Sequence, residues 1–355
     1  GLSLTPKDSG FAKNETKSVT FYGSYWSLSE SDAMPNYLVT APELNAQVIE
    51  STRATIDADT GLEILPHVET YTSNKHHFKR TANDKTQWLT SQTLFDRNAP
   101  HFNAEVSEDD IAQAIIPTPL KVTRHPDNKL LSIKNGLNIV FNQVPLASVS
   151  AALERLSSMG IQQTNDGTPV QLFIEPKPNR VNGSYQLSIT EDGISITGQD
   201  EQGVFYALQS LASLVVLESD TIPQLEIIDA PLFEFRGMLV DVARNFKSKA
   251  FILKLLDQMA AYKLNKFHFH LADDEGWRIE IPSLPELTQI GGQRCFDVTE
   301  QACLMPQLGA GIDTESPANG YYTVADYQEI LRYASARHIQ VIPSLDMPGH
   351  ARAAI

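Results

Sequence analysis

Charged and hydrogen-bonding residues gather at two places in this sequence, each directly after a run of strand-forming residues. One run, Gly237–Val242, leads into Arg244 and Asn245, and the other, Phe267–Leu271, leads into the segment 273–277. Polar groups are costly to hold near a protein core unless they have partners or a function. The two clusters therefore mark a candidate site of chemistry.

The elements around these clusters predict how the polar residues are held in space. The two runs predict buried strands, and the segment that begins at Ser248 predicts an amphipathic helix between them. This order is typical of a (β/α) barrel, whose chemistry lies at the carboxyl ends of its strands. A second helix is expected after Thr323, and a third strand over Ile339–Ser344 is followed by Asp346-Met-Pro-Gly-His350.

Arg244, Asp273 and Asp274 are the first candidates for a functional role. A guanidinium can donate two parallel hydrogen bonds to neighbouring hydroxyls, but Arg244 could instead be a surface residue paired with Asp241 or Asp273. The adjacent carboxylates could act in the site or be solvated charges of a loop. His350 is a further candidate, with a structural, hydrogen-bonded histidine as the alternative.

Five more residues near the strand ends receive weaker interpretations. His268 and His270 alternate along their strand, and we expect one to face the barrel interior and the other the helices. A packed, hydrogen-bonded histidine is the expectation for His268. Asp346 could accept from a donor at a strand end. Glu275 and Trp277 could shape the mouth of a cleft, with packing as the alternative for Trp277.

Charge and hydropathy exclude several classes of protein. Lys and Arg number 28 against 43 Asp and Glu, so the net charge is −15 and nucleic acid is not an expected partner. No apolar run approaches the ~20 residues that span a bilayer, so no transmembrane segment is expected. The chain begins at Gly1 without a basic and apolar leader, so we expect any signal peptide to be absent from it.

The two cysteines, Cys295 and Cys303, lie eight residues apart in a segment expected to be a loop. A local disulfide is favoured over two free thiols because Gly291-Gly292 and Pro306 flank the pair. Such a bond is typical of an oxidising compartment. No further cysteine or nearby histidine completes a zinc site, so neither a metal nor a cofactor is expected.

The chain is predicted to contain several domains rather than one. The first region has short strand-like runs such as Ser18–Tyr22 and Tyr37–Thr40, which favour part of a β-sandwich. Its aromatic residues Tyr22, Tyr25 and Trp26 could stack on sugars, but core packing is the default. The predicted divisions are a partial β-sandwich at 1–60, an irregular connector at 61–115, an α+β domain at 116–230 and an incomplete (β/α) barrel at 231–355.

The α+β domain is predicted from alternating strand and helix patterns. The turn at Glu191-Asp-Gly193 favours a hairpin between two of its strands. The second helix places Val204, Leu208 and Leu211 on one face. The expected strands are 137–141, 170–174, 185–189 and 194–197, and the expected helices are 147–158 and 203–218.

The strand-end residues also carry a family resemblance. The segments Phe235–Asn245, Lys266–Ile281 and Ile342–Ala351 resemble the catalytic domain of family 20 glycoside hydrolases, and most closely the chitobiase-type β-N-acetylhexosaminidases of bacteria. The α+β region and residues 1–60 resemble, more weakly, the two domains that precede that barrel. The segment from Gly291 to Cys303 resembles an insertion of these enzymes that carries a disulfide.

The resemblance implies removal of terminal N-acetylglucosamine from chitobiose and chitin oligosaccharides, with retention of configuration. The acetamido oxygen of the sugar is the nucleophile in this family. The resemblance assigns Arg244 to the sugar hydroxyls, and Asp273 with His350 to tuning the pKa of the acid. Asp274 and Asp346 are expected to contact substrate. A periplasmic, outer-membrane-associated or secreted location is expected.

The family's acid is a Glu that follows an Asp in a His-x-Gly-Gly-Asp-Glu context, which this sequence lacks. Its two Asp-Glu dipeptides, Asp200-Glu201 and Asp274-Glu275, have other surroundings. We therefore expect strands one to three of an eight-stranded barrel and no activity from these residues alone. Self-association or pairing with the missing barrel half could cover the open sheet.

Two other hypotheses stay open at this point. The protein could be a non-catalytic carbohydrate-binding or structural protein built from the same domains. It could also be a different barrel hydrolase in which Asp346 or Glu275 is a true enzymic nucleophile.

Overall fold

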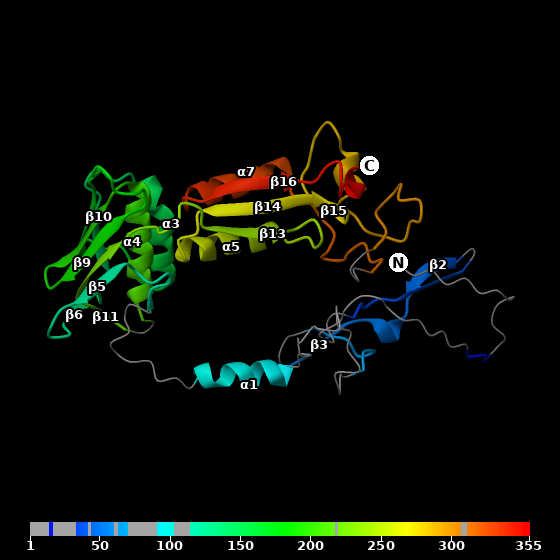
Figure 1. Ribbon diagram of the computed structural model, residues 1–355, viewed down its shortest axis with the longest axis horizontal. Coiled ribbons are helices and arrows are strands. Elements are labelled where there is room, and N and C mark those ends of the chain that lie inside the picture. The colour runs from blue at the N-terminus through cyan, green and yellow to red at the C-terminus, as the bar shows by residue number, and fades with distance from the viewer. Residues whose placement is uncertain are drawn as a thin grey trace, which may run out of the picture. The chain divides into compact units, whose positions relative to one another are not determined.

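Figure 1 shows the computed structural model of the chain. The structure describes eight segments of the sequence. Compact units are formed by Gly1–Glu105 with Gln293–Asn319, and by Val106–Gly292 with Gly320–Ile355. The predicted strand Ser18–Tyr22 and the aromatic residues Tyr25 and Trp26 lie outside the described residues. The described segments are 14–16, 33–41, 44–59, 63–69, 91–102, 114–216, 219–306 and 311–355.

The first unit contains short antiparallel strand pairs. Strand β1 (Leu38–Ala41) pairs with β2 (Leu44–Val48), in agreement with the strand predicted at 37–40. The Thr52 hydroxyl accepts from the backbone N–H of Tyr37 and donates to the carbonyl of Ile49, which ties the strand pair to the turn after it. The other elements are η2 (Glu50–Thr52), β3 (Thr55–Ile56), β4 (Glu63–Ile64) and α1 (Ser91–Phe102).

A disulfide joins Cys295 and Cys303 in this unit, as the sequence predicted. The loop that it closes is organised around the carboxylate of Asp297. That carboxylate accepts from the hydroxyl and backbone N–H of Thr299 and from the backbone N–H groups of Gln301 and Ala302. The Thr299 hydroxyl, followed by these backbone donors, lowers the pKa of Asp297 to about 2.

An α+β domain begins the second unit. Its six-stranded sheet has the order β5-β12-β9-β10-β8-β7, and β9 and β10 form the predicted antiparallel hairpin. Alternate residues of β9, such as Tyr185 and Leu187, are buried, as expected for a sheet with one covered face. The sheet strands are β5 (Lys121–Arg124), β7 (Leu137–Val140), β8 (Thr168–Ile174), β9 (Tyr185–Thr190), β10 (Gly193–Gly198) and β12 (Leu225–Asp229).

Two helices, α3 (Leu146–Ser158) and α4 (Glu201–Leu214), pack against each other in this domain. The predicted end of the second helix at Glu218 is wrong, because the chain turns to an extended conformation at Val215. Apolar residues continue beyond this turn, so periodicity alone overestimates the length of the helix. Four strands were not predicted: β5, β12 and the pair β6 (Leu130–Ser132) and β11 (Thr221–Pro223).

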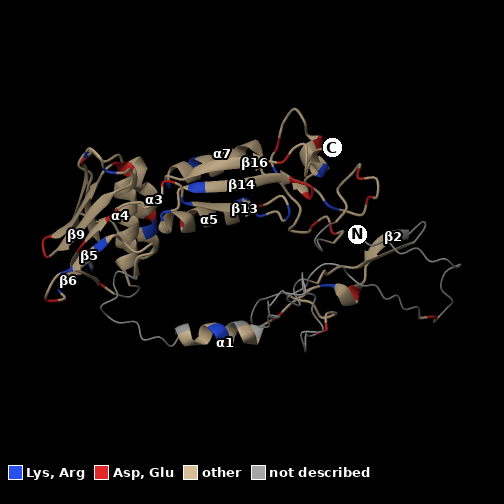
Figure 2. Cartoon of the chain, viewed as in Figure 1, with Lys and Arg blue, Asp and Glu red and all other residues tan. Residues whose placement is uncertain are grey.

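The rest of the second unit has the predicted alternation of strands and helices. Strands β13 (Gly237–Asp241), β14 (Lys266–Asp273) and β16 (Gln340–Leu345) are parallel, with β14 in the centre. Helices α5 (Lys249–Ala261) and α7 (Val324–Ser335) pack against each other. Figure 2 shows a basic beginning and an acidic end of β14, where Lys266 and Asp273 lie.

Side-chain caps explain where these two helices begin. Ser248 accepts from the backbone N–H of Phe251, and Thr323 forms a capping box with Asp326. Both cap residues were predicted from the sequence. The remaining elements of this region are β15 (Gly276–Trp277), which is antiparallel to β14, and the short helices α6 (Glu286–Gln289) and η3 (Arg352–Ala354).

A buried ionic cluster connects the α+β domain to the parallel strands within the second unit. Lys263 is 5% exposed, and its Nζ lies 2.9 Å from Tyr185 Oη and 3.0 Å from Asp229 Oδ2. The Tyr185 hydroxyl donates to the same Asp229 oxygen and also contacts Ser210. Burial lowers the pKa of Lys263, and the Asp229 carboxylate opposes that shift.

We predict that Lys263→Met destabilises this unit because it leaves the Asp229 carboxylate buried without its cation. Loss of one partner of a buried ion pair lowers the free energy of unfolding by about 3–5 kcal/mol. Chemical denaturation at pH 7 measures the change. The matched control is Lys177→Met, which breaks a 4.0 Å pair with Glu175 whose side chains are both more than half exposed. Equal losses in the two variants would contradict the prediction.

Candidate active site

The carboxylate of Asp273 is the centre of the polar cluster at the end of β14. Its side chain is 1% exposed, yet both oxygens accept hydrogen bonds. Oδ2 lies 2.8 Å from His270 Nε2 and 2.7 Å from Arg244 Nη2, and Oδ1 lies 2.7 Å from the backbone nitrogen of Asp274 and 3.0 Å from His350 Nδ1. Burial alone would raise the pKa of Asp273, but these donors hold it below its ordinary value.

Arg244 is held by three carboxylates. Nη1 lies 2.8 Å from Asp241 Oδ2, Nη2 contacts Asp273, and Nε lies 2.9 Å from Glu275 Oε2. Burial favours the neutral guanidine, but the hydrogen bond to Asp241 and the surrounding negative charges raise the pKa of Arg244. The pairing that the sequence suggested with Asp241 or Asp273 is therefore present with both. The result is a fixed guanidinium whose side chain stays 33% exposed at the strand ends.

His350 completes the cluster from the segment that follows β16. Its Nδ1 lies 3.0 Å from Asp273 Oδ1 and 3.4 Å from Asp274 Oδ2, while 60% of its side chain is exposed. The hydrogen bond and negative charge of Asp273, followed by the charge of Asp274, raise the pKa of His350. Arg244 Nη2 is also 3.4 Å from this nitrogen. When Nδ1 carries a proton, that approach joins two donors, so the bond to Asp273 is the stabilising one.

Arg278 is a buried residue that the sequence patterns did not identify. It is 0% exposed, and its Nε and Nη2 donate to the carbonyls of Val242 and Ala243, just before Arg244. Its Nη1 donates to the carbonyls of Gly292 and Gly320. The guanidinium thus fixes the backbone that carries Arg244. The sequence signal was a charged residue inside the Gly276–Ile279 segment, next to a tryptophan.

The expected orientations of His268 and His270 are wrong. Both rings contact the hydroxyl of Ser344 on β16, with His268 Nε2 and His270 Nδ1 each 2.8 Å from its Oγ. Residues two apart in a strand lie on the same face, so the two histidines cannot face opposite sides of the sheet. Phe267 and Phe269 lie on the other face and are 0% exposed.

Three further candidates, Trp277, Asp274 and Asp346, differ in their burial and in their hydrogen-bond partners. Trp277 is 5% exposed, and its indole N–H donates to the carbonyl of Ile279, which favours the packing interpretation. Asp274 accepts from the backbone N–H of Arg352 through Oδ1. Asp346 has a carboxylate oxygen within 4.8 Å of ligand atoms of His270 and Asp273.

Neither Asp-Glu dipeptide resembles a catalytic pair in its environment. Asp200 caps α4 by accepting from the backbone N–H of Gly203 and also accepts from that of Gly183. Asp274 lies beside His350, and Glu275 binds Arg244. The contacts described for Asp200, Asp274 and Glu275 are thus with backbone N–H groups, a histidine and an arginine.

Histidine and carboxylate side chains come close together in two places among the described residues. Two groups have ligand atoms within 4.8 Å of one another: His270 with Asp273 and Asp346, and Asp273 with Asp274 and His350. Both groups depend on Asp273, whose oxygens already accept from Arg244 and other donors. A cation would compete with that guanidinium for the same carboxylate, so we assign no metal to either group.

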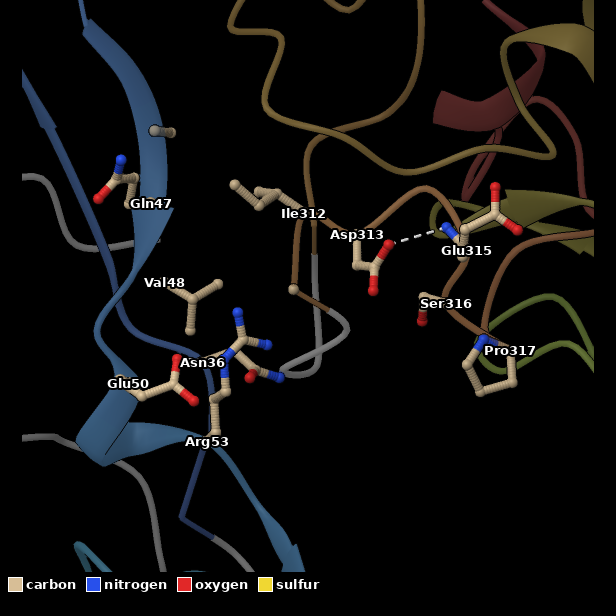
Figure 3. A pocket seen from close by; sticks show the side chains of 12 residues that line it. Asn36, Gln47, Val48, Glu50, Arg53, Ile312, Asp313, Glu315, Ser316 and Pro317 are labelled. Atoms are coloured by element: carbon tan, nitrogen blue, oxygen red, sulfur yellow. Dashed lines mark hydrogen bonds and ion pairs between the residues drawn. The ribbon is translucent and has the colours of Figure 1, made fainter.

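A separate polar cavity of about 580 Å³ lies in the first unit. Figure 3 shows the side chains that line it. Its lining includes the ion pair of Glu50 and Arg53 on one side and Asp313 with Glu315 on the other. Among the residues described as lining it, none has an aromatic ring. The described lining therefore offers no aromatic contact of the kind that small-molecule sites commonly use.

None of the helices that the structure describes combines the length and the apolar character that a bilayer span requires.

Three family models match successive parts of the chain. Residues 2–92 match a domain described as carbohydrate-binding, residues 112–230 match glycosyl hydrolase family 20 domain 2, and residues 233–355 match the glycosyl hydrolase family 20 catalytic domain. The strand ends that carry Arg244, Asp273 and His350 lie within the catalytic match. The chain belongs to glycosyl hydrolase family 20.

Individual relatives agree with this assignment. A beta-hexosaminidase of Vibrio vulnificus is 45% identical over 358 residues, covering 100% of this chain and 41% of the relative. An N,N'-diacetylchitobiase of Vibrio harveyi is 41% identical, covering 100% of this chain and 39% of the relative. The chain therefore spans about two fifths of the length of these proteins.

Solved structures show the same similarity in three dimensions. A family 20 exo-β-N-acetylglucosaminidase of Vibrio harveyi, solved in complex with N-acetylglucosamine, matches with a TM-score of 0.59 and 32% identity. The match covers 68% of this chain and 37% of that structure.

We predict that Asp273→Asn lowers the pKa of His350 toward its ordinary value of 6.5. The substitution removes the negative charge that stabilises the protonated ring and leaves only a neutral amide oxygen as acceptor, so the neutral ring forms at lower pH. The pH dependence of carbethoxylation at His350, followed by mass spectrometry, measures this midpoint. Asp257→Asn is the control, because Asp257 pairs with Tyr333 and Arg337. An unchanged midpoint in Asp273→Asn would refute the assignment.

Proposed function

We propose that the protein is an exo-acting β-N-acetylhexosaminidase of the chitobiase type. It removes terminal N-acetylglucosamine from chitobiose and chitin oligosaccharides with retention of configuration. Family membership supports this proposal, as do the names of the Vibrio relatives. The observation that carries it is the Arg244 guanidinium, fixed by three carboxylates at the strand ends beside the Asp273–His350 pair.

Arg244 is the residue that we assign to sugar binding. A planar guanidinium can donate to two neighbouring hydroxyls of a sugar ring. Because Asp241, Asp273 and Glu275 already fix its orientation, little side-chain entropy remains to be lost on binding. The neighbouring carboxylates of Asp274 and Asp346 are assigned to further contacts with substrate at the same edge.

Asp273 and His350 are assigned to tuning the pKa of the general acid. In this family the acid is a Glu in a His-x-Gly-Gly-Asp-Glu context, which the 355 residues lack. A general acid works best when its pKa lies near the operating pH. A neighbouring negative charge such as Asp273 raises the pKa of a carboxylic acid, and the protonated His350 ring offsets part of that effect. The pair would thereby set the pKa at which the acid operates.

Bond cleavage in this proposal uses a nucleophile of the substrate itself. The acetamido oxygen forms a bond to the anomeric carbon while the acid gives its proton to the departing glycosidic oxygen. Water then attacks the anomeric carbon and gives a proton to the same residue, which restores the acetamido group and retains the configuration.

The finer domain arrangement is part of the same proposal. We assign 1–60 to the end of a β-sandwich, 61–115 to a connector, 116–230 to the α+β domain and 231–355 to strands one to three of an eight-stranded barrel. The 55% exposure of Leu239 on β13 supports an uncovered barrel face. Further barrel strands or a second copy of the chain would bury that face.

A periplasmic, outer-membrane-associated or secreted location also belongs to the proposal. The disulfide between Cys295 and Cys303 supports it, because such bonds persist in oxidising compartments.

We predict that a polypeptide of the relatives' length containing these residues hydrolyses p-nitrophenyl N-acetyl-β-glucosaminide but not p-nitrophenyl β-glucoside. The glucoside lacks the acetamido nucleophile. A 2-deoxy-2-fluoro sugar with a good leaving group should leave the protein unlabelled in intact-mass measurements. Equal turnover of both glycosides, or labelling at Asp346 or Glu275, would overturn the mechanism. Sugar binding without turnover would favour a non-catalytic protein.

Arg244→Lys in the same polypeptide should lower kcat/KM by about 100-fold, or roughly 2.7 kcal/mol, because a lysine cannot form the two parallel bonds. Steady-state kinetics on the N-acetylglucosaminide measure the change. Arg332→Lys on α7 is the matched control, since α7 is not assigned to the site. A loss below threefold in Arg244→Lys would contradict the sugar-binding assignment.

The 355 residues on their own should show negligible hydrolysis of the same substrate. The sequence lacks the family's Asp-Glu context, so no residue is assigned as acid. A spectrophotometric assay with the longer polypeptide as the positive control measures this. Turnover by the 355 residues at a comparable rate would refute the assignment of the acid to a segment outside them.

A further inference from the structure

A row of polar side chains crosses the three parallel strands on the face opposite the buried phenylalanines. Asp241 on β13, His270 on β14 and Ser344 on β16 are direct partners in the strand register. His268 lies two residues before His270 and shares its face. The row ends beside Asp273, so it leads from the sheet to the candidate site.

Hydrogen bonds connect four of the side chains, those of His268, Ser344, His270 and Asp273, into a continuous network. His268 Nε2 lies 2.8 Å from Ser344 Oγ, which in turn lies 2.8 Å from His270 Nδ1. His270 Nε2 lies 2.8 Å from Asp273 Oδ2. His270 is 8% exposed, so both nitrogens of a nearly buried ring are engaged.

The chemistry of the donors and acceptors fixes which atom donates in each of these hydrogen bonds. An ionised Asp273 can only accept, so His270 Nε2 carries a hydrogen. In the neutral ring Nδ1 then accepts from the Ser344 hydroxyl, whose oxygen in turn accepts from His268 Nε2. The Ser344 hydroxyl thus donates to one ring and accepts from the other.

The Asp273 carboxylate needs a buried donor such as His270 because two of its other donors are partly exposed. Arg244 and His350 belong to other segments, and their side chains are 33% and 60% exposed. Rotation of the carboxylate would disturb both of these contacts together. His270 donates to the same oxygen as Arg244, and its ring is held from behind by Ser344.

We propose that Ser344 is a positioning residue, which holds His270 through its hydroxyl and so fixes the orientation of Asp273 against His350. The inference rests on the proposed function, because the Asp273–His350 pair is assigned there to tuning the acid. Ser344 itself is not placed against substrate. It acts through His270 and Asp273.

The charged and titratable groups that surround the hydrogen-bonded side chains of His270 and Ser344 come from all three strands. They are Asp241 and Arg244 from the β13 end, His268, Asp273, Asp274 and Glu275 from β14 and its end, and Asp346 and His350 after β16.

The test is Ser344→Ala in the longer polypeptide, assayed on p-nitrophenyl N-acetyl-β-glucosaminide. Weakening a hydrogen bond to a charged group should lower kcat by about tenfold with little change in KM. The bond from His270 helps to lower the pKa of Asp273, so the acid limb of the kcat profile should move to higher pH. Ser344→Thr, which keeps the hydroxyl, should restore both kcat and the profile.

Ser210→Ala is the control for loss of a hydrogen-bonded serine hydroxyl at a position outside the site. Ser210 is 1% exposed, and its Oγ lies 2.6 Å from Tyr185 Oη in the α+β domain. This variant should lose stability but keep the wild-type pH profile. An unmoved profile in Ser344→Ala, or the same change in both variants, would overturn the positioning role.

Crystal structures of the wild type and Ser344→Ala provide a readout that does not require activity. In the variant the separation of His270 Nε2 and Asp273 Oδ2 should exceed about 3.2 Å, the limit of a good hydrogen bond. An unchanged contact would overturn the inference. A wild type that fails to hydrolyse the substrate would refute the proposed function, and this separation would still decide the role of Ser344.

Discussion

One buried carboxylate, that of Asp273, constrains the arrangement of the parallel strands at their carboxyl ends. An ion with 1% exposure is stable only if donors replace the water that it has lost. His270, Arg244, His350 and a backbone N–H supply these hydrogen bonds from three separate segments. Satisfying this charge therefore brings together the residues that we assign to the sugar and to the acid.

The surrounding fold holds those donors at fixed positions. Arg278 binds the carbonyls that precede Arg244, so the backbone on which the sugar-binding residue stands is fixed by a buried cation. Position 276 has no room for a side chain for the same reason, because a Cβ added to Gly276 would lie 2.5 Å from the Arg278 guanidinium. A buried cation thus holds the backbone before Arg244, and the Arg244 guanidinium in turn contacts carboxylates at the exposed edge.

Local patterns predicted much of this architecture. Ser248 and Thr323 identified the helix starts, and the parallel strands and the disulfide of Cys295 with Cys303 followed from spacing and composition. The role of Arg278 and the meeting of both histidines at Ser344 depend on contacts between distant segments, which periodicity does not contain. The orientation of His268 was a failure of a different kind, since the two-residue period of a strand already places both rings on one face.

A crystal structure of the longer polypeptide with N-acetylglucosamine tests the central claim most directly. Two nitrogens of Arg244 should lie within about 3.2 Å of neighbouring sugar hydroxyls, while Asp273 keeps its contacts with His270 and His350. A sugar bound without contact to Arg244, or an Asp273 carboxylate turned away from His350, would contradict the account.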